Sequence, residues 1–176
     1  MTDEHANDWP DEIYDLMVAA DIRQVAYVPD AGHAHLIERC HANDAMHSVV
    51  LTTEEDGIAQ MAGAWLGGQR GVVLMQSSGV GNCVNMLSLI ASCRMPFVTL
   101  VTMRGEWGEF NPWQVPMGQG TQAAFEIGGV LVYRADSPGE VAPTVDAALR
   151  IAFDGNIAVA VLLSQRLIGR KDFHKD

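Results

Sequence analysis

Basic residues are scarce in this sequence. It has 11 Lys and Arg against 22 Asp and Glu among 176 residues, which gives a formal net charge of -11. Proteins that bind nucleic acid or anionic lipid usually gather Lys and Arg on one face. We therefore expect neither a nucleic-acid partner nor a membrane partner. A small acidic ligand stays compatible with this composition, because a local pocket matters more for it than the net charge.

Cysteine is also rare, with only Cys40, Cys83 and Cys93. Their odd number and their spacing match no disulfide or zinc framework. Cys40 and Cys83 fall in expected helices, where we predict them to be buried small apolar residues. The six histidines form no helical pair of the kind that binds zinc, so we predict no metal site in this chain.

Long apolar runs are absent: none reaches the roughly 20 residues that a membrane helix needs. The acidic start of the sequence lacks the basic and apolar regions of a signal peptide. We therefore expect a cytoplasmic protein. Residues 10–168 are predicted to form one domain, with flexible ends at 1–9 and 169–176.

Hydrophobic residues make up 48% of the sequence and charged residues 19%, a globular composition. Apolar segments with strand character alternate with segments that have helical spacing. The expected strands are 24–30, 47–53, 71–76, 95–102, 130–135 and 156–164. The expected helices are 10–23, 33–44, 54–68, 82–94, 120–129 and 137–155. Because the strands are nearly all apolar, both faces of the sheet should be covered by helices. The pattern predicts an α/β fold with a doubly wound, six-stranded parallel sheet.

Two segments are predicted to lack regular structure. Residues 77–82, SSGVGN, are expected to form a glycine-rich turn, and residues 103–119 a long irregular stretch rich in tryptophan. The polar and basic tail from Gln165 onward is expected to lie outside the core. In open parallel sheets, ligands bind at the carboxyl ends of the strands. The segments that follow the first four strands are therefore the candidates for a site.

Two of these segments also have simple structural explanations. Glu54, Glu55 and Asp56 fit the first turn of a helix, where acidic residues complement the helix dipole. SSGVGN fits a tight strand-to-helix turn, and it matches neither the phosphate-binding P-loop nor the dinucleotide fingerprint. Neither segment by itself indicates a cofactor.

Taken together, TTEEDGIAQMAGAWLGG and GVVLMQSSGVGNCVNMLSL resemble the pyrimidine-binding (Pyr) domain of thiamine-diphosphate-dependent decarboxylases. The sequence is most similar to the group of sulfopyruvate and phosphonopyruvate decarboxylases, and within it to the sulfopyruvate decarboxylase alpha subunits. The resemblance extends from about Val25 to the last strand. The turn departs from the family pattern, with Ser77 where asparagine is common and Cys83 where alanine is.

The resemblance implies thiamine diphosphate as cofactor and assigns the family's catalytic glutamate. Counted back from the Ala62-Gly63 pair, the family spacing falls on Glu54 rather than Glu55. In this family, that glutamate hydrogen-bonds the ring nitrogen N1′ of the aminopyrimidine. The turn after the third strand would lie against the same ring, so the predicted cofactor-binding residues are Glu54, Ser77, Ser78, Gly79 and Asn82.

Other residues are candidates for work on the substrate. Asp30 resembles the acidic residue in the first loop of these decarboxylases and would handle protons, although an ordinary Pro-Asp turn also explains it. His33 is a further candidate for that role. Arg104 is predicted to pair with a substrate anion, with a surface arginine as the alternative. Gln114 is predicted to bind substrate on a closing loop that also carries Trp107 and Trp113.

One family feature is missing from the sequence. The family binds the diphosphate through Mg²⁺ with a GDG motif, and this sequence has no GDG. The resemblance therefore implies a beta-type partner subunit that carries the GDG domain and holds the Mg²⁺. Thiamine diphosphate would then be shared between the two chains of a hetero-oligomer.

Four functions remain open at this point. The first is the Pyr subunit of a 2-oxoacid decarboxylase that converts sulfopyruvate, or alternatively phosphonopyruvate. The second is a carboligase subunit with the same cofactor. The third is a non-catalytic Pyr-like module that binds nucleotides or regulates a partner. The fourth is an unrelated hydrolase using Cys93 and a histidine.

Overall fold

The computed structural model describes residues 9–169. Residues 1–8 and 170–176, which make up most of the two ends expected to be flexible, lie outside this part. The first helix begins at Trp9, and the Trp9 side chain is buried in the core. The first helix thus includes one residue before the predicted helix start at residue 10.

Six strands form a parallel sheet with the order β2-β1-β3-β4-β6-β5. Their bounds are β1 Ile22–Tyr27, β2 His47–Val50, β3 Arg70–Gln76, β4 Phe97–Thr102, β5 Leu131–Ala135 and β6 Ala158–Leu163. The central strand β4 is buried along its whole length, whereas the edge strand β2 is partly exposed. Burial on both faces explains why the central strands are mostly apolar instead of alternating between apolar and polar residues.

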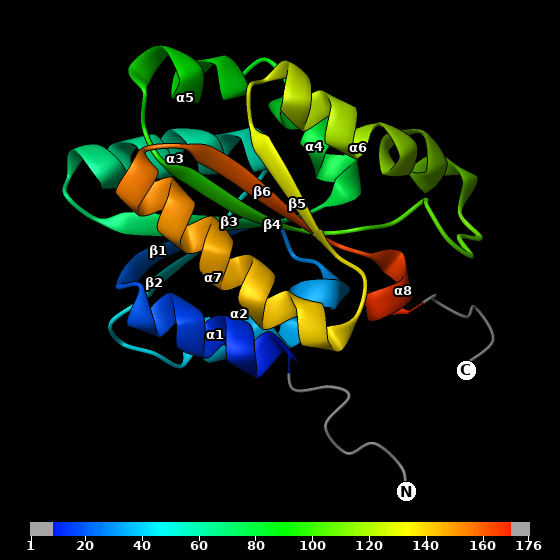
Figure 1. Cartoon of the computed structure of the whole chain (residues 1–176), viewed down its shortest axis with the longest axis horizontal. Helices are drawn as coiled ribbons and strands as arrows, with labels where there is room; N and C mark the ends of the chain where they lie inside the picture. Colours follow the sequence, from blue (N-terminus) through cyan, green and yellow to red (C-terminus); the bar gives the residue numbers. More distant parts are fainter. Residues whose placement is uncertain (1–8, 170–176) are drawn as a thin grey trace, which may run out of the picture.

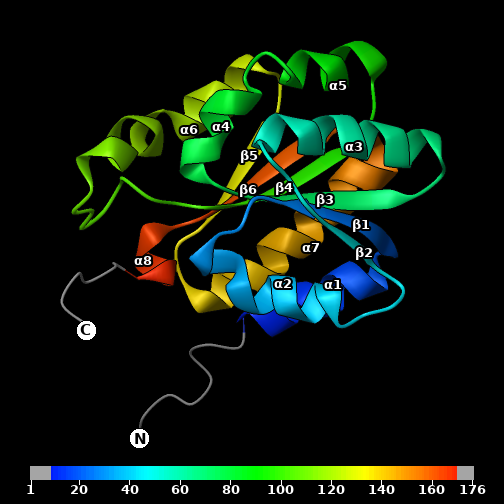
Figure 2. The same ribbon diagram turned by 180° about the vertical axis from the view of Figure 1, so that it is seen from behind.

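Helices cover both faces of the sheet (Figure 1). On one face lie α1 Trp9–Ala19, α2 Ala34–His41 and α7 Pro138–Gly155. The other face carries α3 Glu54–Leu66, α4 Ser77–Cys83, α5 Leu87–Cys93 and α6 Val115–Ile127. The view from behind shows the same two layers with the sheet between them (Figure 2). Each layer packs its own cluster of buried side chains against the sheet. The predicted doubly wound parallel fold is confirmed.

The glycine-rich segment after β3 is helical, so the prediction of a turn at 77–82 is wrong. Residues Ser77–Cys83 form α4, in which Val80 and Cys83 are fully buried. This burial offsets the low helix propensity of the two glycines. The helix expected over 82–94 is divided, and α5 begins only at Leu87. As a result α4 packs between α3 and α6 while α5 continues over the sheet.

The irregular stretch after β4 is shorter than predicted. It ends at the short 3₁₀ helix η2, Pro112–Gln114, which continues directly into α6. The tail expected outside the core begins with a further helical turn, α8 Gln165–Ile168, and Gln165 is buried there. Both errors arise because tertiary contacts, rather than local hydrophobic spacing, stabilise these segments.

Candidate functional site

The candidate residues gather at the carboxyl edge of the sheet, where β1, β2, β3, β4 and β6 end. The 3₁₀ helix η1, Ala31–His33, follows β1, and the helices α3, α4 and α8 begin after β2, β3 and β6. In Figure 1, the start of α4, the loop after β4 and α8 all lie on the side to which the strand arrows point. Parallel strands bring these segments together although they are far apart in the sequence.

Glu54 is the buried acid of this edge. It is the first residue of α3, and only 8% of it is exposed. Its Oε2 accepts a hydrogen bond of 2.9 Å from Asn82 Nδ2 on α4. Among the described residues, no hydrogen bond is made to Oε1, which is left to accept one from outside the chain. Glu55 is only partly buried and Asp56 is exposed, so Glu54 is the member of the acidic trio that faces α4.

Gly79 makes room for the Glu54 side chain. A β-carbon at this position would stand 2.2 Å from the carboxyl carbon of Glu54 and also 2.2 Å from Oε1. A residue with a side chain could not occupy Gly79 without moving the carboxylate. The structure therefore brings Glu54, Gly79 and Asn82 together, three of the residues that the sequence predicted for cofactor binding.

Asp30 lies at the centre of a second group. Its Oδ2 accepts hydrogen bonds from Thr102 Oγ1 at 2.5 Å and from the Gly32 backbone N–H at 3.2 Å. Its Oδ1 accepts one from Gln76 Nε2 at 2.8 Å, and Ser78 Oγ donates to Gln76 Oε1 at 3.0 Å. These bonds orient the carboxylate and link it to α4. An ordinary Pro-Asp turn would require only the bond to Gly32.

Sequence reasoning missed the roles of Gln76 and Thr102. Each is the last residue of its strand, β3 or β4. The signal that was available is the polar residue that closes an apolar strand at the carboxyl edge. The structure shows that both side chains turn toward Asp30.

Ser77 is buried, and its hydroxyl forms hydrogen bonds with the backbone of Arg104. Its Oγ donates to the Arg104 carbonyl at 3.2 Å and accepts from the Arg104 backbone N–H at 3.0 Å. The hydroxyl thus joins the start of α4 to the loop after β4. The Ser77 side chain is fully buried and supports this loop, and its predicted contact with a cofactor stays a prediction.

The Arg104 side chain is also buried, which excludes the surface-arginine alternative. Its Nε and Nη2 donate to the two carboxylate oxygens of Glu109 at 2.6 and 2.7 Å. The Arg104 guanidinium holds the pKa of the Glu109 carboxyl down at about 2. Glu109 therefore stays ionised and compensates the charge of Arg104, a feature that the sequence did not indicate.

His33 lies under the edge and not at its surface. Only 1% of the residue is exposed, and its Nε2 lies 3.1 Å from the Leu100 carbonyl oxygen, to which it donates as a neutral ring. Burial lowers the pKa of the imidazole, so the ring remains neutral at physiological pH. In this position His33 supports the turn that carries Asp30, and its predicted part in catalysis stays a prediction.

Gln114 and two tryptophans border the same edge. Gln114 is partly buried, and its Oε1 is a buried oxygen without a hydrogen-bond partner within residues 9–169. Trp107 is 43% exposed and Trp113 is 84% exposed. The loop after β4 therefore presents aromatic surface outward, whereas the Gln114 amide oxygen is buried.

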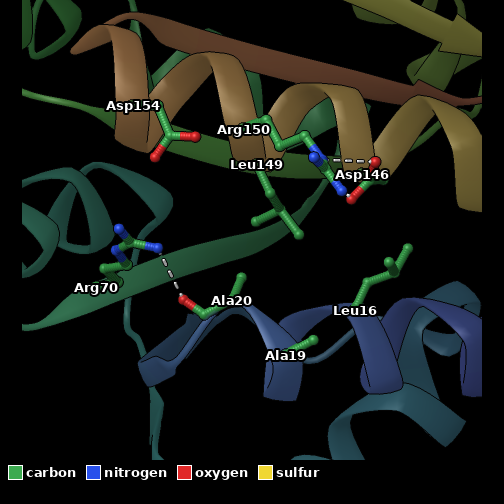
Figure 3. Close-up of a pocket in the computed structure, with 8 residues that line it drawn as sticks. All are labelled: Leu16, Ala19, Ala20, Arg70, Asp146, Leu149, Arg150 and Asp154. Carbon is green, nitrogen blue, oxygen red and sulfur yellow. Dashed lines mark hydrogen bonds and ion pairs between the residues drawn. The ribbon is translucent and has the colours of Figure 1, made fainter.

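Pockets occur at both ends of the sheet. One of about 150 Å³ lies at the carboxyl edge between Asp30, Thr102, Arg104 and the end of α8. Another of about 240 Å³ lies at the opposite edge between α1 and α7 (Figure 3). In that second pocket Arg150 pairs with Asp146, and Arg70 donates to the Ala20 carbonyl. The pocket near Asp30 is the one that adjoins the candidate residues.

Residues 9–169 form one sheet with helices on both faces. No group of three or more His, Cys, Asp or Glu side chains in that range is arranged to hold a metal ion. No helix of the same range has the length and apolar character needed to cross a bilayer.

Comparison with known proteins identifies the family. Residues 9–117 match the family described as thiamine pyrophosphate enzyme, N-terminal TPP binding domain. The chain belongs to this family. The matched range contains Asp30, Glu54, all of α4, Arg104 and Gln114, so the carboxyl edge described above lies almost entirely within the thiamine pyrophosphate enzyme domain.

Two relatives among the thiamine pyrophosphate enzymes differ in length. The sulfopyruvate decarboxylase subunit alpha of Methanothermobacter thermautotrophicus is 35% identical over 89% of this chain and 95% of its own length. The phosphonopyruvate decarboxylase of Streptomyces viridochromogenes is 35% identical over 75% of this chain, but only 32% of its own length is covered. The chain thus matches nearly the whole of the first relative and about a third of the second.

A solved structure agrees with the fold. The 2-oxoglutarate:ferredoxin oxidoreductase of Magnetococcus marinus superposes with a TM-score of 0.69 at 12% identity, over 91% of this chain and 29% of that chain. At this identity the likeness concerns the fold alone.

Proposed function

We propose that this chain is the pyrimidine-binding subunit of a sulfopyruvate decarboxylase, active together with a partner subunit. The observation that carries the proposal is the presentation of Glu54. One oxygen of its carboxylate is held by Asn82, and the other is available beside Gly79. The relative named sulfopyruvate decarboxylase subunit alpha is matched by this chain over 95% of the relative's own length.

The residues at this edge fit the aminopyrimidine of thiamine diphosphate. Glu54 Oε1 can accept a hydrogen bond from a protonated ring nitrogen, and the absence of a side chain at Gly79 leaves the space that this carboxylate occupies. When bound, the cofactor supplies an electron sink for the cleavage of a carbon–carbon bond. Glu54 would fix the ring and hold a proton at its nitrogen.

In the proposed reaction the bond between the carboxylate and the keto carbon of sulfopyruvate breaks. Carbon dioxide leaves, and a proton takes its place on that carbon to give sulfoacetaldehyde. Asp30 is the proposed proton-handling group, because its carboxylate is oriented by Thr102 and Gln76 beside the pocket at the carboxyl edge. His33 would contribute only through the position of Asp30. Arg104 and Gln114 would face the substrate from the loop after β4.

The remaining machinery would come from a second chain. The sequence has no GDG motif, and the proposed partner is a beta-type subunit that holds Mg²⁺ and the diphosphate. The relative lengths support this division, because the chain matches nearly all of an alpha subunit but only about a third of a phosphonopyruvate decarboxylase. The 35% identity to that second relative makes phosphonopyruvate the second candidate substrate.

The test is the release of carbon dioxide from sulfopyruvate by the chain co-expressed with its GDG-bearing partner, with thiamine diphosphate and Mg²⁺. We expect Glu54→Gln to abolish release in a complex that still assembles and Glu55→Gln, the neighbouring acid, to retain it. Phosphonopyruvate and a carboligation assay with an acceptor aldehyde are run in parallel. A folded, cofactor-bound complex that leaves sulfopyruvate intact would contradict the proposal.

If Glu54→Gln retained full turnover, the assignment of the catalytic glutamate would be wrong. Assembly without any turnover or cofactor binding would favour a regulatory Pyr-like module instead. These outcomes distinguish a wrong substrate assignment from a wrong assignment of the catalytic glutamate or of the enzymatic function.

A further inference from the structure

Gln165 connects the end of the sheet to the loop after β4. It is the first residue of α8, and only 1% of it is exposed. Its Oε1 accepts the backbone N–H groups of Glu106 and Trp107 at 3.1 and 3.0 Å. Its Nε2 donates to Glu109 Oε2 at 2.9 Å, and its backbone N–H donates to Glu106 Oε1 at 2.7 Å. One side chain thus satisfies three groups of a loop that is more than 50 residues away in sequence.

Glu109 accepts a hydrogen bond from Gln165 and also binds the Arg104 guanidinium, so it connects the two residues. Its side chain is only 3% exposed. Besides Gln165, it accepts from Arg104 Nε and Nη2 and from the backbone N–H groups of Gly105 and Asn111, at 3.2 and 3.0 Å. A carboxylate with this many donors has a fixed orientation, and so does the guanidinium that it binds in a fork.

Arg104 is therefore held at both ends. Ser77 Oγ binds its backbone on both sides, and Glu109 binds two of its guanidinium nitrogens. The third nitrogen, Nη1, makes no hydrogen bond within the described part of the chain. Arg104 lines the pocket of about 150 Å³ together with Asp30, and the end of α8 closes that pocket. The arrangement leaves one pair of N–H donors for a ligand at this position.

We propose that Gln165 is a positioning residue that, through Glu109, fixes Arg104 beside the Asp30 pocket for binding of the substrate's second anionic group. The inference rests on the proposed function, because it assigns that group to the sulfonate of the 2-oxoacid. Gln165 lies outside the range matched by the family, and it acts on Arg104 without contacting the substrate.

The expected effect of losing Gln165 is on substrate affinity. Without its Nε2 donor, Glu109 loses one bond, and the Glu106–Trp107 backbone loses its acceptor. The loop then samples positions in which Arg104 is displaced. Because a hydrogen bond to a charged group is lost, the KM for sulfopyruvate should rise by about tenfold while kcat stays within about twofold.

The experiment compares Gln165→Leu and Gln165→Glu with Gln122→Glu in the assembled complex. Gln122 is an exposed residue of α6 whose amide also bonds a glutamate, Glu126, so it is a matched control. KM and kcat for sulfopyruvate are measured from pH 5.5 to 8, and hydrogen exchange of residues 104–111 is measured in the same complexes. Gln165→Glu places a carboxylate between Glu106 and Glu109, so its KM defect should diminish as the pH falls and the new carboxyl is protonated.

A raised KM with retained kcat, faster exchange in 104–111 and recovery of Gln165→Glu at low pH would support the inference. An unchanged KM despite faster exchange would overturn it, because the contact would then be structural only. Unchanged exchange in both Gln165 variants would also overturn it. Absence of turnover in the wild-type complex is a different result, because it would contradict the proposed function itself and therefore also this inference.

Discussion

Gly79 and Glu54 are packed so tightly that any side chain at Gly79 would meet the carboxylate, with a β-carbon 2.2 Å from its carboxyl carbon. This contact joins α4 to α3 beside the carboxylate that we propose for binding of the aminopyrimidine. The position of the carboxylate thus depends on a residue that contributes no functional group.

Gly79→Ala is expected to displace Glu54 and to lower the free energy of unfolding by about 1–3 kcal/mol, because a methyl group must be forced into a packed contact. Cofactor affinity in the assembled complex should fall with it. The matched control is Gly63→Ala in α3, where a β-carbon would meet nothing within 4 Å. That change should stabilise the chain by up to about 1 kcal/mol, since alanine favours a helix interior. Urea unfolding and titration with thiamine diphosphate measure both effects, and equal behaviour of the two variants would refute the role of Gly79.

Asn82→Asp is expected to weaken thiamine diphosphate binding more than Asn82→Ala does. Either change removes the 2.9 Å hydrogen bond to Glu54, and the aspartate adds a like charge beside the carboxylate. Loss of a hydrogen bond to a charged group costs about 1.5–3 kcal/mol. Asn85→Asp, three residues along the chain, serves as the control because, within residues 9–169, no hydrogen bond joins the Asn85 side chain to Glu54. Calorimetric titration of the complex decides the order of affinities, and identical dissociation constants for all three variants would show that Asn82 does not act on Glu54.

Asp30→Asn is expected to keep the fold and to lower kcat by about 100-fold. The amide keeps the shape of the carboxylate but removes a group able to exchange protons. Asp56→Asn, an exposed position of α3, should leave turnover unchanged. The measurement is steady-state carbon dioxide release by the complex, with circular dichroism to verify folding. Wild-type turnover in Asp30→Asn would assign Asp30 to the turn alone.

Glu109→Gln is expected to change the acid dependence of stability. The Arg104 guanidinium lowers the pKa of Glu109 from 4.5 to about 2 in the folded chain. A carboxyl with a lowered folded pKa contributes stability that is fully present above its unfolded pKa and is lost as the pH falls toward the folded value. Above about pH 5, the wild type should therefore exceed the variant by about 3 kcal/mol, the typical loss on breaking a buried ion pair.

Between pH 4.5 and 2 this difference should shrink. Urea unfolding of both proteins across the range provides the measurement. A difference that stays constant down to pH 2 would show that Glu109 does not titrate against Arg104.

Alkylation should distinguish the three cysteines. Burial raises the pKa of Cys83 to about 12 and that of Cys40 to about 11, so both thiols stay protonated and inaccessible. Cys93 is exposed. Iodoacetamide at pH 8 should therefore add one group to the folded chain, at Cys93, and three groups in urea, as counted by mass spectrometry. Cys93→Ser should keep full activity in the complex, and a loss of activity would revive the hydrolase hypothesis.

Features that depend on residues close together in the sequence were predicted correctly. Burial of Cys40 and Cys83, the alternation of six apolar strands with helices, and the position of Glu54 at the start of α3 were predicted from the sequence and are confirmed. The capped start of α7, where Ser137 and Glu140 bond each other's backbone, also follows the Ser-Pro signal. These features depend on residues only a few positions apart.

Features that depend on distant segments were missed or wrongly predicted. The bond of the Ser77 hydroxyl to the Arg104 backbone, 27 residues away, was not predicted. The sequence also did not indicate that Glu109 would bind Arg104, and substrate binding by Arg104 stays a prediction. The tail was expected outside the core, yet Gln165 reaches Glu109 across 56 residues. No local spacing encodes these pairs.

The sequence by itself therefore determined the class of fold, the family resemblance and the placement of Glu54 at a helix start, because hydrophobic period and helix start signals act within one or two turns of chain. Only the tertiary structure decided how that carboxylate is held, which oxygen remains available, and which residues fix Arg104. These properties arise from the packing of α4, the loop after β4 and α8 at one edge of the sheet. A buried polar group must find its hydrogen-bond partner wherever the fold places one, and that partner can lie anywhere along the chain.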